Sequence, residues 1–160
     1  MDCSRLGGGR NVTLLLKMMD HCPELQLVWA GIPCGTASRA KDIEGKGLPK
    51  ATRSEEEPWG ITTRQLSPIE RSKLESANSV YWSVLKVMWY CIKRGIDWII
   101  ENPGRSYLWF IKEFCDMLDV QGVGYIELHA CMLGSNRQKW SRLRGTVKCL
   151  EPFEQQMVHR

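Results

Sequence analysis

Cys34 is the residue of this chain whose setting is most typical of a nucleophile. It stands in the segment "GIPCGTASRA" (31–40), directly after Pro33 and at the end of the apolar run "LQLVWAGI". Most cysteines inside a protein are small apolar core residues. Arg39 and Lys41 follow closely, however, and nearby cations favour the thiolate, which is the reactive form of the side chain. The segment therefore leaves two interpretations of Cys34 open, a nucleophile and a core residue.

Glu101 and Asn102 are a second pair of candidate functional residues, in the segment "IIENPGRS" (99–106). A carboxylate at the end of a strand is as often a helix cap or a solvated residue as a binding group. The functional interpretation is a buried Glu101 that hydrogen-bonds a nitrogen-bearing ligand. Asn102 and Pro103 would then form the turn that aims this carboxylate.

A basic run, "GSNRQKWSRLR" (134–144), is the third candidate. A run of charges is usually a solvated face of a protein. Here an aromatic residue lies among the cations, and this combination suits contacts with the phosphates of a nucleic acid. The residues concerned are Arg137, Lys139, Trp140, Arg142 and Arg144.

Two other uses of cysteine fit the chain poorly. A phosphate-binding loop of the phosphatase type needs a longer span than the one from Cys34 to Arg39. Zinc ligands usually come in closely spaced pairs, and the Cys and His residues near 21–22 and 129–131 lack that spacing. We therefore expect no metal site.

Hydrophobic periodicity and turn signals divide the chain into alternating helices and strands. The clearest helix spans 67–95, because Ser67, Pro68 and Glu70 form a capping signature and Gly95 follows the last turn. The alternation predicts a parallel, doubly wound α/β sheet. Ligands bind beyond the carboxyl ends of the strands in such sheets, where all three polar segments fall. The other expected elements are helices at 11–22 and 105–119 and strands at 25–30, 96–104, 122–133 and 146–150.

Length and composition fit one globular domain. The chain has 160 residues, of which 43% are hydrophobic and 25% charged, and its net charge of +4 permits a nucleic-acid partner without identifying one. No apolar run is long enough to span a membrane, and the N-terminus lacks the layout of a signal peptide. Seven cysteines without CxxC pairs indicate reduced thiols and an intracellular location, nuclear in a eukaryote. We expect a flexible leader at 1–10, a partial domain at 11–150 with a long mobile loop at 33–67, and a tail at 151–160.

Three short motifs, taken in their order along the chain, resemble those of the cytosine-5 DNA methyltransferases. They are a Pro-Cys after one strand, a Glu-Asn after the next and an Arg-x-Lys after a third. The extended forms "PCGTASRA", "IENPGRSYLW" and "HACMLGSNRQKWSRLR" also resemble a divergent group of uncharacterised eukaryotic methyltransferase-like proteins, some associated with mobile elements. The resemblance covers roughly residues 11–148 and corresponds to the later half of the catalytic domain. It implies a partial Rossmann-like class I methyltransferase fold, with a mostly parallel sheet, flanking helices and a long loop after the first strand. It also implies S-adenosylmethionine as the cofactor and DNA as the partner, with RNA left open as an alternative.

The resemblance also implies a role for each polar segment. Cys34 would add to carbon 6 of cytosine, because carbon 5 is a poor nucleophile until a group has added to carbon 6. Glu101 would protonate or hydrogen-bond ring nitrogen 3, and Arg137 would hold the base or its covalent adduct. A duplex target would have to be flipped out, and the 33–67 loop would close over the site. The residues expected to bind the substrate are Pro33, Asn102, Lys139, Arg39 and Arg142.

The chain departs from that family at several points. Ile32, Gly35 and Pro103 stand where the family has proline, glutamine and valine. No glycine-rich turn follows a strand, since none precedes the "GGGR" at 7–10, so the cofactor-binding residues stay unknown. Two hypotheses follow: a methyltransferase fragment whose methyl donor is held by residues outside this chain or by a partner, or an inactive remnant with at most nucleic-acid binding. An amino-group methyltransferase fits less well, because Gly-Ile-Pro-Cys at 31–34 replaces the Asp/Asn-Pro-Pro-aromatic tetrad of that class.

Overall fold

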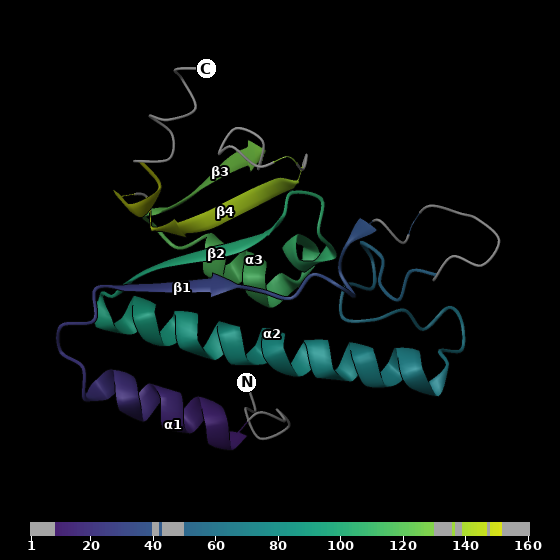
Figure 1. Cartoon of the computed structure of the whole chain (residues 1–160), viewed down its shortest axis with the longest axis horizontal. Coiled ribbons are helices and arrows are strands. Elements are labelled where there is room, and N and C mark those ends of the chain that lie inside the picture. Colours follow the sequence, from purple (N-terminus) through teal and green to yellow (C-terminus); the bar gives the residue numbers. More distant parts are fainter. Residues whose placement is uncertain are drawn as a thin grey trace.

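The computed structural model has an α/β fold, in which a four-stranded sheet lies against helices (Figure 1). It describes residues 9–39, 42, 50–129, 136, 139–146 and 148–151. Within this part of the chain, no helix is both long and apolar enough to cross a bilayer. In chain order the elements are α1 (Gly9–Asp20), β1 (Leu27–Gly31), α2 (Pro68–Arg94), β2 (Asp97–Pro103), η3 (Tyr107–Phe110), α3 (Lys112–Leu118), β3 (Val123–His129) and β4 (Trp140–Thr146).

The sheet is mixed. Its strand order is β1-β2-β4-β3, with β1 parallel to β2 and with β4 inserted antiparallel between β2 and β3. The general α/β class predicted from the sequence is therefore confirmed. The prediction of a parallel, doubly wound sheet is wrong, because β4 runs against both of its neighbours.

Strand β4 takes the place of part of the expected basic loop. Its residues alternate, with Ser141, Leu143 and Gly145 buried and with Arg142 and Arg144 half-buried between them. An arginine can lay its stem and guanidinium along aromatic rings and so occupy a half-buried strand position. Hydropathy alone does not indicate such a strand. The strand expected at 146–150 is also wrong, since residues 148–151 form a helical turn.

Helix α2 begins and ends where the sequence predicts. The Ser67 side chain accepts from the main-chain N–H of Glu70, the Glu70 carboxylate accepts in return, and Pro68 is the first helical residue. Gly95 ends the helix in the left-handed conformation, with φ 65°, which glycine adopts without strain. The helix expected over 105–119 is instead split at Ile111 into η3 and α3.

The long segment between β1 and α2 contains no α-helix or strand in its described residues. The expected loop at 33–67 is thus present there. Thr52 and Arg53 in its second half are nevertheless 3% and 1% exposed, so this part is packed into the protein. The mobility expected for the loop stays a prediction.

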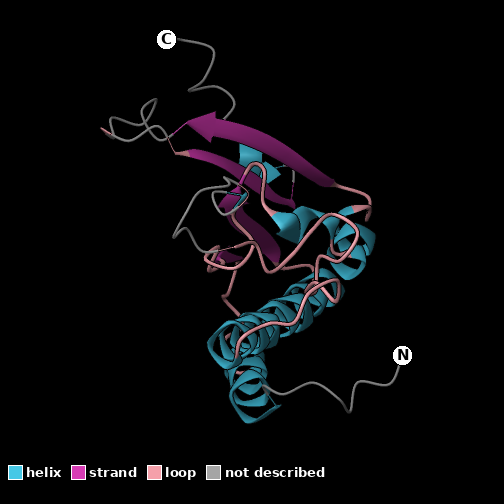
Figure 2. Cartoon of the chain, turned by 90° about the vertical axis from the view of Figure 1, so that its right-hand side faces the viewer, coloured by secondary structure: helices cyan, strands magenta, loops and turns pink. Residues whose placement is uncertain are grey.

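Helices α1, α2 and α3 lie on the same side of the sheet. The main core joins residues of α1, α2 and α3 to Trp98 and Ile100 of β2. Helix α2 lies between α1 and the sheet, as the two views show (Figures 1 and 2). The turn at the carboxyl end of β1 lies next to the first half of α2.

The opposite face of the sheet is less covered in the described part of the chain. A smaller cluster gathers there around Ile99 and Leu143, with Leu150 of the helical turn packed against it. At β1 the same face is open to solvent: Trp29, the register partner of Ile99, is 49% exposed and Leu27 is 44% exposed. Strands next to a parallel partner are usually buried on both faces, so β1 is unusually open.

Candidate active site

Residues 33–38, named the Cys34 turn from here on, begin directly beyond β1. The main-chain N–H of Ile32 donates to the carbonyl of Glu101 at 3.2 Å, which extends the β1–β2 ladder to the start of the turn. The carbonyl of Cys34 then accepts from the N–H groups three and four residues further on, at 3.0 and 2.8 Å. Cys34 is half-buried and is not in a disulfide. The turn is therefore a defined structure at the carboxyl edge of the sheet.

Two buried polar side chains fix the start of this turn. Asn102 is fully buried, and its amide nitrogen donates to the carbonyl of Ile32 at 2.8 Å. The hydroxyl of Tyr81 donates to the carbonyl of Pro33 at 3.3 Å, and burial raises the pKa of Tyr81, so that the hydroxyl stays protonated. Pro33 and Asn102 are two of the residues that the sequence predicts to bind substrate. In the structure both help to fix the turn, and Asn102 is closed off from solvent.

Glu101 and Lys139 are brought together at the same edge. Glu101 lies opposite Gly31 of β1 and Leu143 of β4. Its Oε1 accepts from Lys139 Nζ at 2.9 Å and from the hydroxyl of Ser141 at 2.6 Å. Both bonds engage Oε1, so among the described residues Oε2 is left for a ligand. The side chain of Glu101 is 21% exposed, which allows a ligand to approach it.

Arg142 lies on the other face of the sheet from Glu101. It is the register partner of Asn102, one residue beyond the Glu101 position. Its Nε donates to Glu127 Oε1 at 2.8 Å, and its guanidinium lies over the rings of Trp109 and Tyr125 at 5.9 and 5.5 Å. The structure therefore does not bring this substrate-binding candidate to the Glu101 carboxylate.

Arg39 and Arg137 complete the predicted set. Arg39 forms an ion pair with Glu55, and its guanidinium lies 5.0 Å from the ring centre of Tyr107 and 5.5 Å from that of Phe110. Its charge is thus neutralised beside the Cys34 turn. Arg137, the predicted catalytic cation, lies outside the described residues.

A hollow of about 540 Å³ borders the Cys34 turn. Pro33, Gly35 and Thr36 line one side, and α2 supplies the other from Ser72 to Val80. Gly35 has open space where a side chain would point. The hollow therefore opens between the Cys34 turn and the first half of α2.

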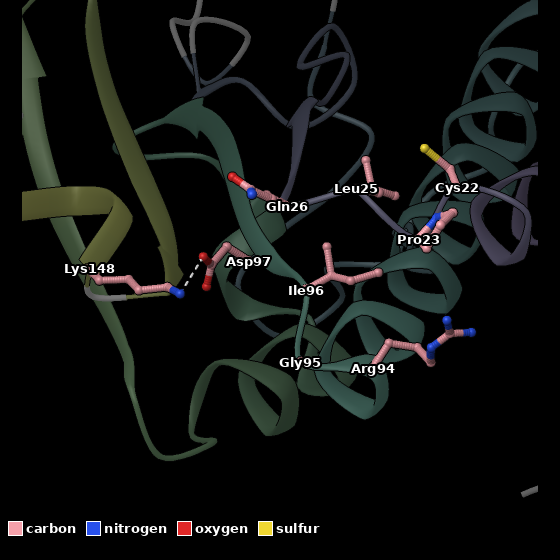
Figure 3. A pocket seen from close by; sticks show the side chains of 9 residues that line it. All are labelled: Cys22, Pro23, Leu25, Gln26, Arg94, Gly95, Ile96, Asp97 and Lys148. Atoms are coloured by element: carbon pink, nitrogen blue, oxygen red, sulfur yellow. Dashed lines mark ion pairs between the residues drawn. The ribbon is translucent and has the colours of Figure 1, made fainter.

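A second hollow, of about 510 Å³, lies at the other end of the strands (Figure 3). It is bordered by the residues just before β1 and by Asp97 at the start of β2, whereas Glu101 is near the end of β2. Its cations are paired, Lys148 with Asp97 at 2.7 Å and Arg94 with Asp20 at 2.6 Å. It is therefore separate from the candidate site.

Sequence reasoning missed three residues of the site. Ser141 falls in the basic run 134–144, where charge gives no sign of a buried strand position. Tyr81 falls within the predicted helix 67–95, and the contact of its hydroxyl with Pro33 depends on residues distant in the chain. Arg53 stands in the polar stretch "ATRSEEEPWG", where no local signal indicates burial. Within the described ranges no group of Cys, His, Asp and Glu could hold a metal ion.

Comparisons with family models, with curated proteins and with solved structures find no match for this chain.

Proposed function

We propose that this chain carries the base-modifying part of a cytosine-5 methyltransferase domain, with Cys34 as the nucleophile and a cytosine in DNA as its target. The observation that carries the proposal is the pairing at the carboxyl edge of the sheet. Gly31 lies opposite Glu101 in parallel register, so the Cys34 turn starts beside the main chain of Glu101, and Lys139 forms an ion pair with the Glu101 carboxylate. A thiol, a carboxylate and a cation at one edge are the groups that addition to a pyrimidine requires.

The chemistry assigned to this chain is the covalent addition step. The thiolate of Cys34 forms a bond to carbon 6 of the base, and the electron pair of the carbon 5–carbon 6 double bond moves toward carbon 5. A proton at ring nitrogen 3 lowers the cost of this step, and Glu101, in its protonated form, would donate this proton from Oε2. Lys139 and Ser141 orient that carboxylate from its other oxygen. Loss of the thiolate reverses the step and restores the base.

The methyl donor, S-adenosylmethionine, finds no matching site in the described residues. No glycine-rich turn follows a strand there, and Gly104, directly after β2, is covered by the Trp140 ring, which a Cβ would approach to 2.5 Å. The residues present therefore do not fit the cofactor, and no step of the proposed chemistry is routed through it. The donor would be held by other polypeptide residues.

The fold is compatible with the later part of a Rossmann-like methyltransferase domain. Its α/β sheet begins with two parallel strands, and the helices α1, α2 and α3 pack on one face. The exposed Leu27 and Trp29 on the other face are what a partial domain would expose. Together with the missing donor site, this supports the expectation that the chain is one part of a larger catalytic unit.

Trapping with 5-azacytosine in an oligonucleotide tests the proposal. The nitrogen at ring position 5 makes carbon 6 more electrophilic, so an adduct forms without a methyl donor. We expect an adduct on the Cys34 peptide by mass spectrometry, its loss in Cys34→Ser, and a decrease of about 100-fold in rate in Glu101→Gln. Cys22→Ser, which removes an exposed cysteine at the other end of the sheet, is the matched control. The proposal is refuted if Cys34→Ser forms as much adduct as the unmodified chain, or if the unmodified chain forms no adduct with DNA or RNA.

An inactive remnant that only binds nucleic acid is the second candidate. The observation that favours it is the same missing donor site. It predicts no adduct in the trapping experiment, together with a DNA affinity that falls as salt is raised.

A further inference from the structure

Arg53 is a buried cation held by neutral groups. It is 1% exposed and lies in the segment between β1 and α2. Its Nη1 donates to the carbonyl of Pro58 at 2.6 Å, and its Nη2 donates to Asn78 Oδ1 at 2.8 Å. In the part of the chain that the structure describes, no carboxylate pairs with it, and burial lowers the pKa of Arg53. A charge buried in this way is costly, so its presence calls for an explanation.

The remaining contacts of Arg53 lead to the Cys34 turn. Both Nε and Nη2 donate to Thr36 Oγ1, at 3.2 and 3.0 Å. The guanidinium also lies 4.8 Å from the ring centre of Tyr81, whose hydroxyl donates to Pro33. The positive charge therefore contacts Thr36, two residues after Cys34, and is linked through Tyr81 to Pro33, the residue before Cys34.

The network is closed through helix α2. Asn78, which accepts from Arg53, donates from its amide nitrogen to the carbonyl of Trp59 at 2.8 Å. Trp59 in turn stacks on Trp82 of α2, with ring centroids 4.7 Å apart. The guanidinium thus joins α2 and the 50–60 segment to the turn, and the fixed fork of its donors suits this geometry.

A purely structural role is served at lower cost by an apolar residue. Replacing buried charged groups with well-packed apolar side chains is often neutral or stabilising. A cation close to a cysteine, by contrast, favours the reactive thiolate. Of the two cations that the sequence suggests for this purpose, Arg39 is neutralised by Glu55, and Lys41 lies outside the described residues. Arg53 is the cation at the turn without such a partner among the described residues.

We propose that Arg53 is a positioning residue for Cys34, which fixes the Cys34 turn through Thr36 and places its buried positive charge against that turn. This inference rests on the proposed function in one respect, the use of Cys34 as a nucleophile. The property that it concerns, the reactivity of the thiol, is measurable without DNA or a methyl donor.

The test is the alkylation rate of Cys34 by iodoacetamide, followed by mass spectrometry of its peptide. Free thiols are largely ionised at about pH 10. The ratio of the rate near pH 7 to the rate at about pH 10 therefore reports the thiolate fraction, independently of access to the thiol. We expect Arg53→Met to lower this ratio about tenfold, the effect of one lost neighbouring charge, and Arg53→Lys to restore most of it. Arg64→Met is the matched control. Arg64 lies in the same segment but bonds Glu70 and the carbonyl of Ala51.

Circular dichroism establishes that each variant is folded. If Arg53→Met does not fold, Thr36→Val decides, because it removes the hydroxyl that accepts from Arg53 and keeps the buried charge; we then expect the ratio to fall about threefold. Any of three results overturns the inference: the ratio is unchanged in a folded Arg53→Met, it is unchanged in Thr36→Val, or it falls equally in Arg64→Met. A lowered ratio without any 5-azacytosine adduct would instead support the role of Arg53 and refute the proposed reaction.

Discussion

Lys139 Nζ lies 2.9 Å from Glu101 Oε1, an ion pair between residues 38 positions apart in the chain. It ties the residue before β4 to the end of β2, so the last strand of the sheet orients a carboxylate supplied by an earlier one. The Lys139 side chain is 52% exposed, and surface ion pairs of this kind contribute little to stability. The effect of the pair is therefore on the direction of the Glu101 carboxylate.

Replacing Lys139 separates orientation from stability. In Lys139→Met we expect the free energy of unfolding to change by less than about 1 kcal/mol. The rate of 5-azacytosine adduct formation should fall about tenfold, because Glu101 loses a group that orients it. Urea denaturation and trapping measure the two effects. Lys112→Met, which removes an exposed ion pair with Asp116, should change neither. A large loss of stability with an unchanged trapping rate would contradict this account.

Asn102 should act on stability as well as on the site. Asn102→Ala removes the bond to the Ile32 carbonyl and leaves that buried acceptor unpaired. We expect the free energy of unfolding to fall by about 1–3 kcal/mol, measured by urea denaturation. Asn136→Ala, at an exposed position, should stay within about 0.5 kcal/mol of the unmodified protein. Equal effects of the two substitutions would show that the buried amide does not hold the turn.

Local signals account for the parts of the fold that the sequence predicted correctly. Ser67, Glu70 and Gly95 determine the ends of α2 through contacts within a few residues. The Cys34 turn and Glu101 were placed at strand ends because the apolar runs before them stop there. Each of these features depends on neighbours in the chain, which a single sequence displays.

The parts that the sequence did not predict depend on distant partners. Arg142 and Arg144 are compatible with a strand only because Trp109 and Tyr125 offer rings to pack on. The burial of Arg53 likewise requires acceptors from two other segments. Charge alone favours a loop in both cases, so the sequence predicts solvent exposure where the fold gives packing.

The capping box of α2 predicts a dependence of stability on acid. The Arg64 side chain, followed by Ser67, holds the pKa of Glu70 down from 4.5 to about 2. A carboxylate with a lowered pKa in the folded state stabilises the protein above its unfolded pKa, and this contribution is lost as the pH falls from about 4.5 towards 2. Glu70→Gln should therefore cost about 1–2 kcal/mol near neutral pH, and less through that window.

Urea denaturation of both proteins across a pH series measures this difference. Glu75→Gln, at an exposed position on the same helix, is the control, and it should give a small difference that does not change with pH. A difference between Glu70→Gln and the unmodified protein that stays constant from neutral pH down to about pH 2 would contradict the linkage.

Gly145 tests the insertion of β4 between β2 and β3. A Cβ at this position would lie 2.1 Å from the carbonyl oxygen of Trp98 and 2.9 Å from the Cα of Ile99, both of them main-chain atoms that cannot move aside. Gly145→Ala should therefore push β4 away from β2 and lower the free energy of unfolding by about 3 kcal/mol. Gly31→Ala, where a Cβ meets open space, should change it little. Since Lys139 and Ser141 reach Glu101 from the start of β4, Gly145→Ala should also slow 5-azacytosine trapping in the protein that remains folded. If the alanine were tolerated without loss of stability, β4 could not occupy the place between β2 and β3 from which it orients Glu101.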